Sequence, residues 1–207
     1  MAMKSQNSKH HYFIAENHDS SDYFEFACYY GSKQFKFTSC DDVFSKNEID
    51  LGSKILVDTI LKDATNYSGK ILDMCCGYGA IGVLLSEYLE ATFDMCDINT
   101  LALDLCKINT KNNGSRVDKI FSSDIWENVD CKYNHIVSNP PIKVGKKVLI
   151  DFINNAPKYL EQNGTLTIVI KKNLGADSTK KYLTEIFGNC EVLEREKGYY
   201  ILQSKKI

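Results

Sequence analysis

The hydrophobic positions of this chain change their spacing several times, and each change marks a new predicted element. Near the N-terminus, residues 23–30 and 34–38 are rich in aromatic and β-branched side chains and flank Gly31-Ser32, which predicts a β-hairpin. From residue 51 onward, stripes at three- and four-residue spacing predict helices, and the short apolar runs between them predict strands. The helical stripes begin near residues 51, 81, 101, 149 and 179, and the strands cover 70–74, 92–96, 119–121, 133–137, 165–170, 191–194 and 199–203.

Strands that alternate with helices indicate a largely parallel sheet with helices on both faces, which is an α/β fold. The last two predicted strands have no helix between them, so we expect them to pair as an antiparallel hairpin. The sequence therefore predicts an N-terminal extension with a β-hairpin over residues 1–50 and one α/β domain over residues 51–207.

Composition narrows the class of protein. A chain of 207 residues with 43% hydrophobic residues can bury a full core, and one main domain is expected. The formal net charge of -2 is not that of a general nucleic-acid binder, so any polyanion would have to meet a local basic patch.

The eight cysteines form no C-x-x-C pair, so no metal site is expected. The first residues lack the apolar core of a signal peptide, and no run reaches transmembrane length. We therefore expect a cytoplasmic protein with reduced thiols and no membrane partner.

The chemistry is concentrated in Ser138-Asn139-Pro140-Pro141, directly after the apolar run 133–137. Two prolines cannot continue a central strand, so the strand is predicted to stop there. A stiff loop then presents the Asn139 side chain and a free Pro140 carbonyl at the carboxyl end of the strand, where open α/β sheets bind ligands. Two such acceptors can hold both N–H groups of a planar amine.

A glycine loop follows the first sheet strand, and its residues fit two kinds of cofactor. Gly77, Gly79 and Gly82 spell the dinucleotide pattern G-x-G-x-x-G, and Asp97 follows at the distance expected of a ribose-binding acid. Asp73 to Gly82 equally fit the S-adenosylmethionine loop D-x-G-x-G-x-G with Cys75 at the first glycine. Ordinary helix-packing glycines are the structural alternative.

The rest of the chain favours methyl transfer over hydride transfer. Its four histidines offer no evident proton relay, and an Asn-Pro-Pro loop has no role with a nicotinamide. An exocyclic amine on a base is a poor nucleophile because its lone pair is delocalised into the ring. Gripping both N–H groups favours a pyramidal nitrogen aimed at a sulfonium methyl, so positioning supplies most of the rate.

Two further groups lie near predicted strand ends. Asp124 follows the third sheet strand, where it would either accept a hydrogen bond from an adenine amine or serve as a helix N-cap or turn acid. Five lysines follow the Pro-Pro turn or end the next strand and predict a phosphate-binding rim: Lys143, Lys146, Lys147, Lys171 and Lys172.

Taken together, the motifs resemble a known family. They are Val43 to Lys46 with Ile49 to Ser53, then Asp73 to Gly82, Asp97-Ile98-Asn99, Ser123-Asp124, Ser138 to Lys147, Lys171-Lys172 with Gly175-Ala176, and Phe187-Gly188-Asn189. This order is similar to that of the small, single-domain class I S-adenosylmethionine-dependent methyltransferases related to ribosomal RNA small subunit methyltransferase C. The similarity runs from about residue 11 to the C-terminus, and Asn-Pro-Pro-Ile-x-x-Gly-Lys is its specific part.

The resemblance implies a Rossmann-like, seven-stranded sheet, S-adenosylmethionine as methyl donor, and guanine N2 in small-subunit (16S) ribosomal RNA as acceptor. Ribosomal RNA or the small ribosomal subunit would then be the partner of a monomer or homodimer. It also assigns roles. Cofactor contacts are implied for Asp73, Cys75, Gly77, Gly79, Asp97, Ile98, Asp124, Ile125 and Asn139, and contacts with the target base for Asn139, Pro140, Pro141 and Ile142.

Two residues depart from the family pattern. Cys75 replaces a glycine, and Ile142 stands where many relatives carry an aromatic residue that stacks on the base. The same Asn-Pro-Pro loop also serves adenine-N6 and protein glutamine-N5 methylation, so both stay open as alternatives. A ribosome assembly factor with vestigial transferase activity is the alternative from another class of protein.

Overall fold

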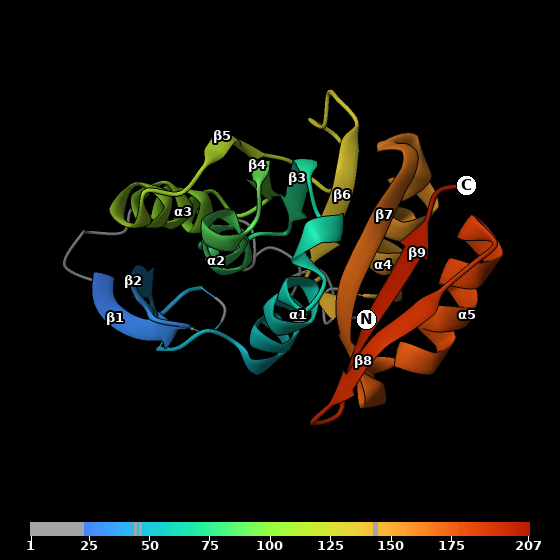
Figure 1. Cartoon of the computed structure of the whole chain (residues 1–207), viewed down its shortest axis with the longest axis horizontal. Helices are drawn as coiled ribbons and strands as arrows, with labels where there is room; N and C mark the ends of the chain where they lie inside the picture. Colours follow the sequence, from blue (N-terminus) through green and yellow to red (C-terminus); the bar gives the residue numbers. More distant parts are fainter. Residues whose placement is uncertain (1–22, 44, 46, 143–144) are drawn as a thin grey trace, which may run out of the picture.

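The computed structural model describes residues 23–43, 45, 47–142 and 145–207 of the chain. A seven-stranded sheet forms its centre, with the strand order β5-β4-β3-β6-β7-β9-β8 (Figure 1). All neighbouring strands are parallel except β9, which is antiparallel to β7 and β8. The strands are β3 (Gly69–Met74), β4 (Ala91–Asp97), β5 (Val117–Ser122), β6 (Tyr133–Ser138), β7 (Leu160–Lys171), β8 (Glu191–Glu196) and β9 (Tyr199–Lys205). The predicted fold class is confirmed.

Helices cover both faces of the sheet. Those of one face are α1 (Leu51–Leu61), α2 (Ala80–Tyr88) and α3 (Thr100–Asn113), and those of the other are α4 (Lys146–Asn155) and α5 (Ala176–Phe187). Because successive side chains of a strand point to opposite faces of the sheet, neighbouring residues pack in two different hydrophobic cores, one on each face. Ile71 packs in the core under α1 and α2, whereas Leu72 packs in the core under α4 and α5.

The N-terminal hairpin consists of β1 (Tyr23–Tyr30) and β2 (Lys33–Cys40), and it lies beside α3 (Figure 1). Phe35 and Phe37 are fully buried in the same core as α1 and α2. The buried Asn109 of α3 exchanges hydrogen bonds with the Thr38 backbone and also donates to the carbonyl of Tyr78. The hairpin is thereby tied to the loop that follows β3, while its assignment to a separate extension over residues 1–50 stays a prediction.

Two element boundaries differ most from the prediction. The apolar stripe from Leu149 to Tyr159 predicts one helix, but α4 ends at Asn155 and a 3-10 turn, η4 (Ala156–Lys158), follows. Pro157 lies in that turn, where its missing N–H would break an α-helix. Strand β7 starts at Leu160, five residues before the predicted position, because Leu160 pairs with Tyr133 of β6. The polar residues 161–164 that follow give no strand signal in the sequence. The other short 3-10 segments are η2 (Ala64–Asn66) and η5 (Lys172–Leu174).

The crossover between β3 and β6 determines where a ligand can bind. From β3 the chain builds β4 and β5 on one side, then crosses back to place β6 on the other side of β3. Met74 pairs with Ser138, so Cys75 and Asn139 are the first residues beyond two adjacent central strands. Such a switch point, at the carboxyl ends of parallel strands, is where open α/β sheets hold ligands. Among the described residues, no helix is long and apolar enough to cross a membrane.

Candidate active site

The loop between β3 and α2 turns sharply because three of its residues have left-handed backbones. Cys75, Gly77 and Gly79 have φ angles of 59°, 56° and 90°. A Cβ on Gly77 would meet no atom within 4 Å, so a ligand can approach this backbone closely. This left-handed conformation costs a non-glycine residue such as Cys75 roughly 1–2 kcal/mol of conformational energy.

Gly82 serves a different purpose from Gly77. It lies inside α2, and a Cβ there would come within 2.2 Å of Met95 Cε and 3.2 Å of Asp73 Oδ2. Its absent side chain lets α2 pack directly on the sheet. A Cβ on Gly79 would lie 2.8 Å from Cys106 Sγ, so the pattern G-x-G-x-x-G combines one open position, Gly77, with two glycines that allow close packing.

Asp97 ends β4 beside the glycine loop. One carboxylate oxygen accepts a 2.9 Å hydrogen bond from the Gly77 N–H, and the other accepts a 2.9 Å bond from the Asn99 N–H. Burial raises the pKa of the Asp97 carboxyl, and hydrogen bonds from backbone N–H groups, these two among them, oppose that shift. Each carboxylate oxygen keeps a further lone pair for a ligand hydroxyl. Ile98, which follows, is half-buried.

Asp73 lies fully buried beneath the loop. Its Oδ2 accepts a 2.9 Å hydrogen bond from the Gly82 N–H, while its Oδ1 has no partner among the described residues. Burial raises the pKa of the Asp73 carboxyl to about 7, with the charge of Asp97 adding to the shift. An unpaired buried carboxylate oxygen is stabilised by a cationic ligand group.

The segment after β5 lies next to Asp97, because Asp97 pairs with Ser122. Asp124 is exposed and its carbonyl accepts from the Glu127 N–H, so it opens a turn and not the N-cap of a helix. Ile125 has a positive φ of 50° and is half-buried. Ser123 braces the turn by donating its hydroxyl to the Ile125 carbonyl at 2.8 Å.

Asn139 follows β6 and is held by two residues that sequence reasoning missed. Its Nδ2 donates to Asp50 Oδ2 and to Ser53 Oγ, each at 3.0 Å. Asp50 is the N-cap of α1 and also accepts from the Ser53 N–H at 3.1 Å. The signal available in the sequence is an acid three residues before a serine at a helix start, which predicts a cap but not its contact with residue 139.

The Pro140 carbonyl corrects one expectation, because it is not free. It accepts a 2.9 Å hydrogen bond from the Ile142 N–H, which closes a tight turn around Pro141. A carbonyl oxygen has two lone pairs, so one acceptor position remains for an incoming N–H. Ile142 is half-buried and packs against the core on the α4 side of the sheet.

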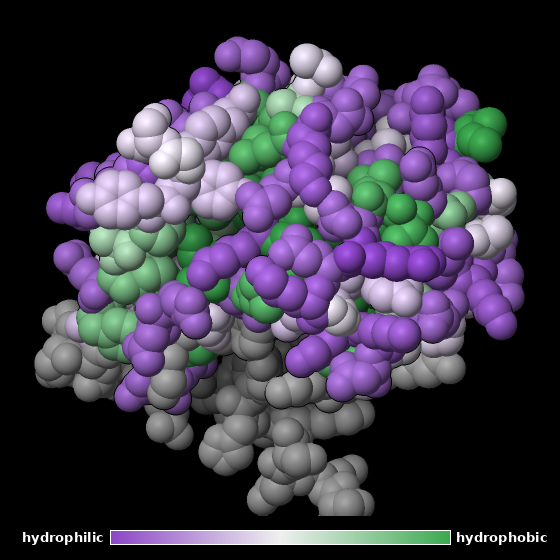
Figure 2. All heavy atoms as spheres, turned by 60° about the horizontal axis from the view of Figure 1, so that its bottom comes forward, coloured by the Kyte–Doolittle hydropathy of each residue, from purple (hydrophilic) through white to green (hydrophobic). Residues whose placement is uncertain are grey.

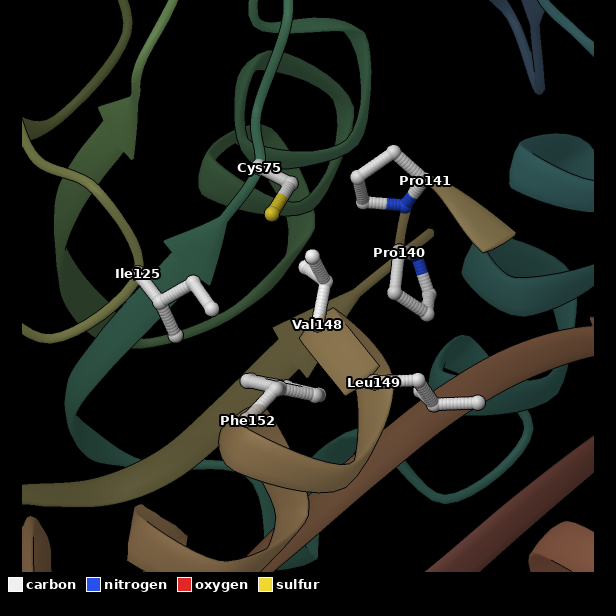
Figure 3. Close-up of a pocket in the computed structure, with 7 residues that line it drawn as sticks. All are labelled: Cys75, Ile125, Pro140, Pro141, Val148, Leu149 and Phe152. Atoms are coloured by element: carbon white, nitrogen blue, oxygen red, sulfur yellow. The ribbon is translucent and has the colours of Figure 1, made fainter. Parts of the chain in front are cut away.

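A small apolar cavity of about 10 Å³ lies beside this loop, with room for about one water molecule (Figure 3). It brings three predicted regions together, namely the glycine loop, the turn after β5 and the Pro-Pro turn, and α4 closes it. Figure 3 shows the Cys75 side chain directed toward Val148 from the glycine loop. The lining residues are Cys75, Ile125, Pro140, Pro141, Val148, Leu149 and Phe152.

The predicted basic rim is only partly described. Lys171 and Lys172 are exposed at the carboxyl end of β7, and Lys147 is exposed in the first turn of α4. Lys146 begins α4, whereas Lys143 lies outside the described residues. The edge with the β8–β9 turn, at the bottom of Figure 1, comes forward in Figure 2, where hydrophilic side chains cover most of the surface. No group of three or more metal-binding side chains occurs within the part of the chain that the structure describes.

These groups fit one kind of cofactor. An open backbone at Gly77, an acid at Asp97 and an unpaired buried oxygen on Asp73 suit a ligand with ribose hydroxyls and a positively charged amino group. S-adenosylmethionine carries both. The arrangement, on a seven-stranded sheet with one antiparallel strand, defines a class I methyltransferase.

Comparison with known proteins agrees. The family described as "Methyltransferase small domain" matches residues 34–203, and the chain belongs to this family. It is thus an S-adenosylmethionine-dependent methyltransferase, as the resemblance implied. "Uncharacterized protein YbxB" of Bacillus subtilis (strain 168) is 41% identical over 179 residues, which cover 85% of this chain and 88% of that protein.

Other relatives are longer. The ribosomal RNA small subunit methyltransferase C of Vibrio parahaemolyticus is 33% identical over 184 residues, covering 85% of this chain and 51% of that enzyme. The chain thus spans about half the length of such relatives. A solved T. thermophilus 16S rRNA N2 guanine methyltransferase, in complex with AdoMet and guanosine, shares the fold with a TM-score of 0.80 at 23% identity. That match covers 89% of this chain and 51% of the solved one.

Proposed function

We propose that this methyltransferase modifies the exocyclic N2 amine of a guanine in small-subunit ribosomal RNA. The observation that carries the proposal is the fixed carboxamide of Asn139 at the end of β6, beside the loop that fits the cofactor. The relatives named for small-subunit ribosomal RNA methylation support the choice of substrate.

The chain contributes mainly position and hydrogen bonds. Asn139 Oδ1 and the remaining lone pair of the Pro140 carbonyl would accept the two N–H groups of the target amine. When bound, S-adenosylmethionine supplies a methyl group that is already strongly electrophilic. A strong general base is therefore unnecessary, since the amine becomes acidic as its new bond forms and its proton can pass to water. The main contribution of Asn139 and Pro140 to the rate would be to hold the target amine nitrogen in line with the methyl group.

The residues proposed to hold the cofactor come from three strand ends. Asp73 and the backbone at Gly77 and Gly79 would hold the methionine part, and Asp97 the ribose. The exposed Asp124 would accept from the adenine amine, with Ile98 and Ile125 as apolar neighbours. Cys75 lies at the cavity between this region and the Pro-Pro turn.

The RNA would reach the site across the carboxyl edge of the sheet. Lys147, Lys171 and Lys172 are exposed there, and we include Lys143 and Lys146 in the same proposed rim. Phosphate contacts of this kind position a nucleic acid without reading its sequence. A base edge can enter the site only after the nucleotide leaves its stack.

The test is to identify the methylated product. Purified protein is incubated with labelled S-adenosylmethionine and either naked small-subunit ribosomal RNA or assembled subunits, and the nucleosides are analysed by mass spectrometry. N2-methylguanosine is expected, and Asn139→Ala should remove it. N6-methyladenosine, or label in protein glutamine, would overturn the substrate while keeping the mechanism. Cofactor binding with no transfer to any acceptor would favour an assembly factor.

A further inference from the structure

The motif Asp50-Leu51-Gly52-Ser53 is not among the residues proposed to contact the cofactor or the target base. It forms the first turn of α1 and lies against Asn139, 86 to 89 residues further along the chain. Both N–H bonds of the Asn139 carboxamide are engaged by it, one at Asp50 Oδ2 and one at Ser53 Oγ. The amide therefore has no free donor to offer a substrate.

The chemistry of Asp50 fixes which way the amide faces. A carboxylate oxygen only accepts hydrogen bonds, so the atom of Asn139 that touches it must be the nitrogen. Turning the amide over would place Oδ1 against the Asp50 carboxylate and break that hydrogen bond, whereas the Ser53 hydroxyl can pair with either atom. The Asn139 oxygen is thus directed away from α1, and it is the atom available to accept from an amine.

The same turn leaves no room for a side chain at Gly52, next to the Asp50 carboxylate. A Cβ on Gly52 would lie 2.9 Å from Asp50 Oδ2 and 2.9 Å from the Tyr199 ring carbon Cε1. The Ser53 N–H holds the same carboxylate oxygen at 3.1 Å. The N-terminus of α1 also favours a negative charge at this position.

We propose that Asp50 and Ser53 are positioning residues for methyl transfer, which lock Asn139 with its oxygen toward the target amine. This inference rests on the proposed function and adds a determinant of its rate. Donation to a carboxylate also polarises the amide, so its oxygen becomes a better acceptor. Neither residue is required to touch the substrate, and both act through Asn139.

Asp50→Ser provides the sharpest test. Serine is as good an N-cap as aspartate, so α1 keeps its cap. The serine side chain is shorter, however, and Asn139 loses a partner. We expect kcat to fall roughly 10- to 100-fold, the scale of a misplaced reacting group. The RNA KM and the Kd of S-adenosylhomocysteine should change less than about twofold, because the substitution removes no proposed contact with bound RNA or cofactor.

Three further variants separate positioning from stability. Asp50→Asn can present one oxygen to both N–H donors, so it should restore most of kcat. Ser53→Ala removes the other partner and should lower kcat without a matching change in KM. Thr59→Ala is the matched control, since its hydroxyl donates to the Ile55 carbonyl within α1, and it should leave kcat unchanged.

A second readout does not depend on activity. In the wild-type protein the Asn139 side-chain NH2 group should give two sharp, well-separated NMR signals, which shift or broaden in Asp50→Ser and Ser53→Ala. Wild-type kcat together with unchanged Asn139 signals in both variants would overturn the inference. If the wild-type protein methylates no RNA, the proposed function fails, and the NMR signals alone then decide whether Asp50 and Ser53 hold the amide.

Discussion

The backbone N–H of Gly77 donates a 2.9 Å hydrogen bond to the carboxylate of Asp97, which joins the glycine loop to the end of β4. The two residues are 20 positions apart, and each belongs to a different half of the proposed cofactor site. One carboxylate thus shapes the loop and offers acceptors to the ribose.

Replacing Asp97 by alanine should weaken cofactor binding. The loss removes the loop contact and the proposed ribose contact, so we expect the affinity for S-adenosylhomocysteine to fall by roughly 1–3 kcal/mol, the scale of hydrogen bonds to a charged group. Isothermal titration calorimetry measures this change. Asp97→Asn, which keeps an oxygen for Gly77, should lose less. Tight binding of NAD with none of S-adenosylhomocysteine would contradict the cofactor assignment.

Asn139→Ala should stop methyl transfer while leaving cofactor affinity nearly intact. The lost acceptor acts on the target amine, and such an interaction contributes mainly in the transition state. Single-turnover transfer to RNA and calorimetry with S-adenosylhomocysteine give the two readouts. A fully active Asn139→Ala variant would refute the proposed mechanism.

Cys75→Gly should be tolerated and should bind the cofactor at least as tightly as the wild type. Its φ of 59° favours glycine by roughly 1–2 kcal/mol, and its side chain lines the cavity. Cys75→Ala is the matched control, because it keeps Cβ and removes only the sulfur. If Cys75→Gly and Cys75→Ala bind the cofactor equally tightly, any change from the wild-type affinity is due to the sulfur atom and not to Cβ. Loss of binding in Cys75→Gly would show that the loop does not work as proposed.

Charge reversal on the proposed rim should weaken RNA binding. Glutamate at Lys147, Lys171 or Lys172 should raise the RNA KM and reduce the salt dependence of binding by roughly one unit of slope per lost phosphate contact. Lys205→Glu, exposed at the opposite edge of the sheet, is the control. Binding isotherms over a range of salt concentrations provide the measurement. If the salt dependence of RNA binding is the same in the rim variants and the control, the RNA-binding surface lies outside the proposed rim.

His135 should make the protein less stable in acid. It is buried, its Nδ1 lies 2.8 Å from Thr165 Oγ1, and burial lowers its pKa to about 4. The unfolded chain binds a proton near pH 6.5, whereas the folded chain does not until about pH 4. Stability is therefore lost as the pH falls through that window, by about 2 to 3 kcal/mol at pH 4.5.

Urea unfolding of the wild type and of His135→Gln at pH 7 and pH 4.5 tests this prediction. The free energy of unfolding lost between the two pH values should be about 2 to 3 kcal/mol smaller in the variant. Asp73 contributes with the opposite sign, because its raised pKa of about 7 favours the folded state at lower pH. It is present in both proteins and cancels. An equal loss in wild type and variant would assign the acid sensitivity to other groups.

Much of the fold can be predicted from the sequence because its signals are local. The apolar run 133–137 followed by two prolines predicts where a strand ends to within one residue, since β6 ends at Ser138. Asn112-Asn113-Gly114 predicts the end of a helix, and Gly114 caps α3 with a left-handed backbone. By contrast, the polar residues 161–164 give no strand signal, and the first part of β7 is a strand because its backbone pairs with Tyr133 and with Lys206.

By itself, the sequence determined the order of strands and helices, the motifs that follow the central strands β3 and β6, and the family to which the chain belongs. These depend on periodicity, turn chemistry and short motifs, which act over a few residues. Only the tertiary structure decided which distant groups meet. It placed Asp50 and Ser53 on the Asn139 amide and engaged the Pro140 carbonyl with Ile142. It also separated the open Gly77 from the packed Gly82, because such contacts follow from how α1, α2 and the sheet pack together.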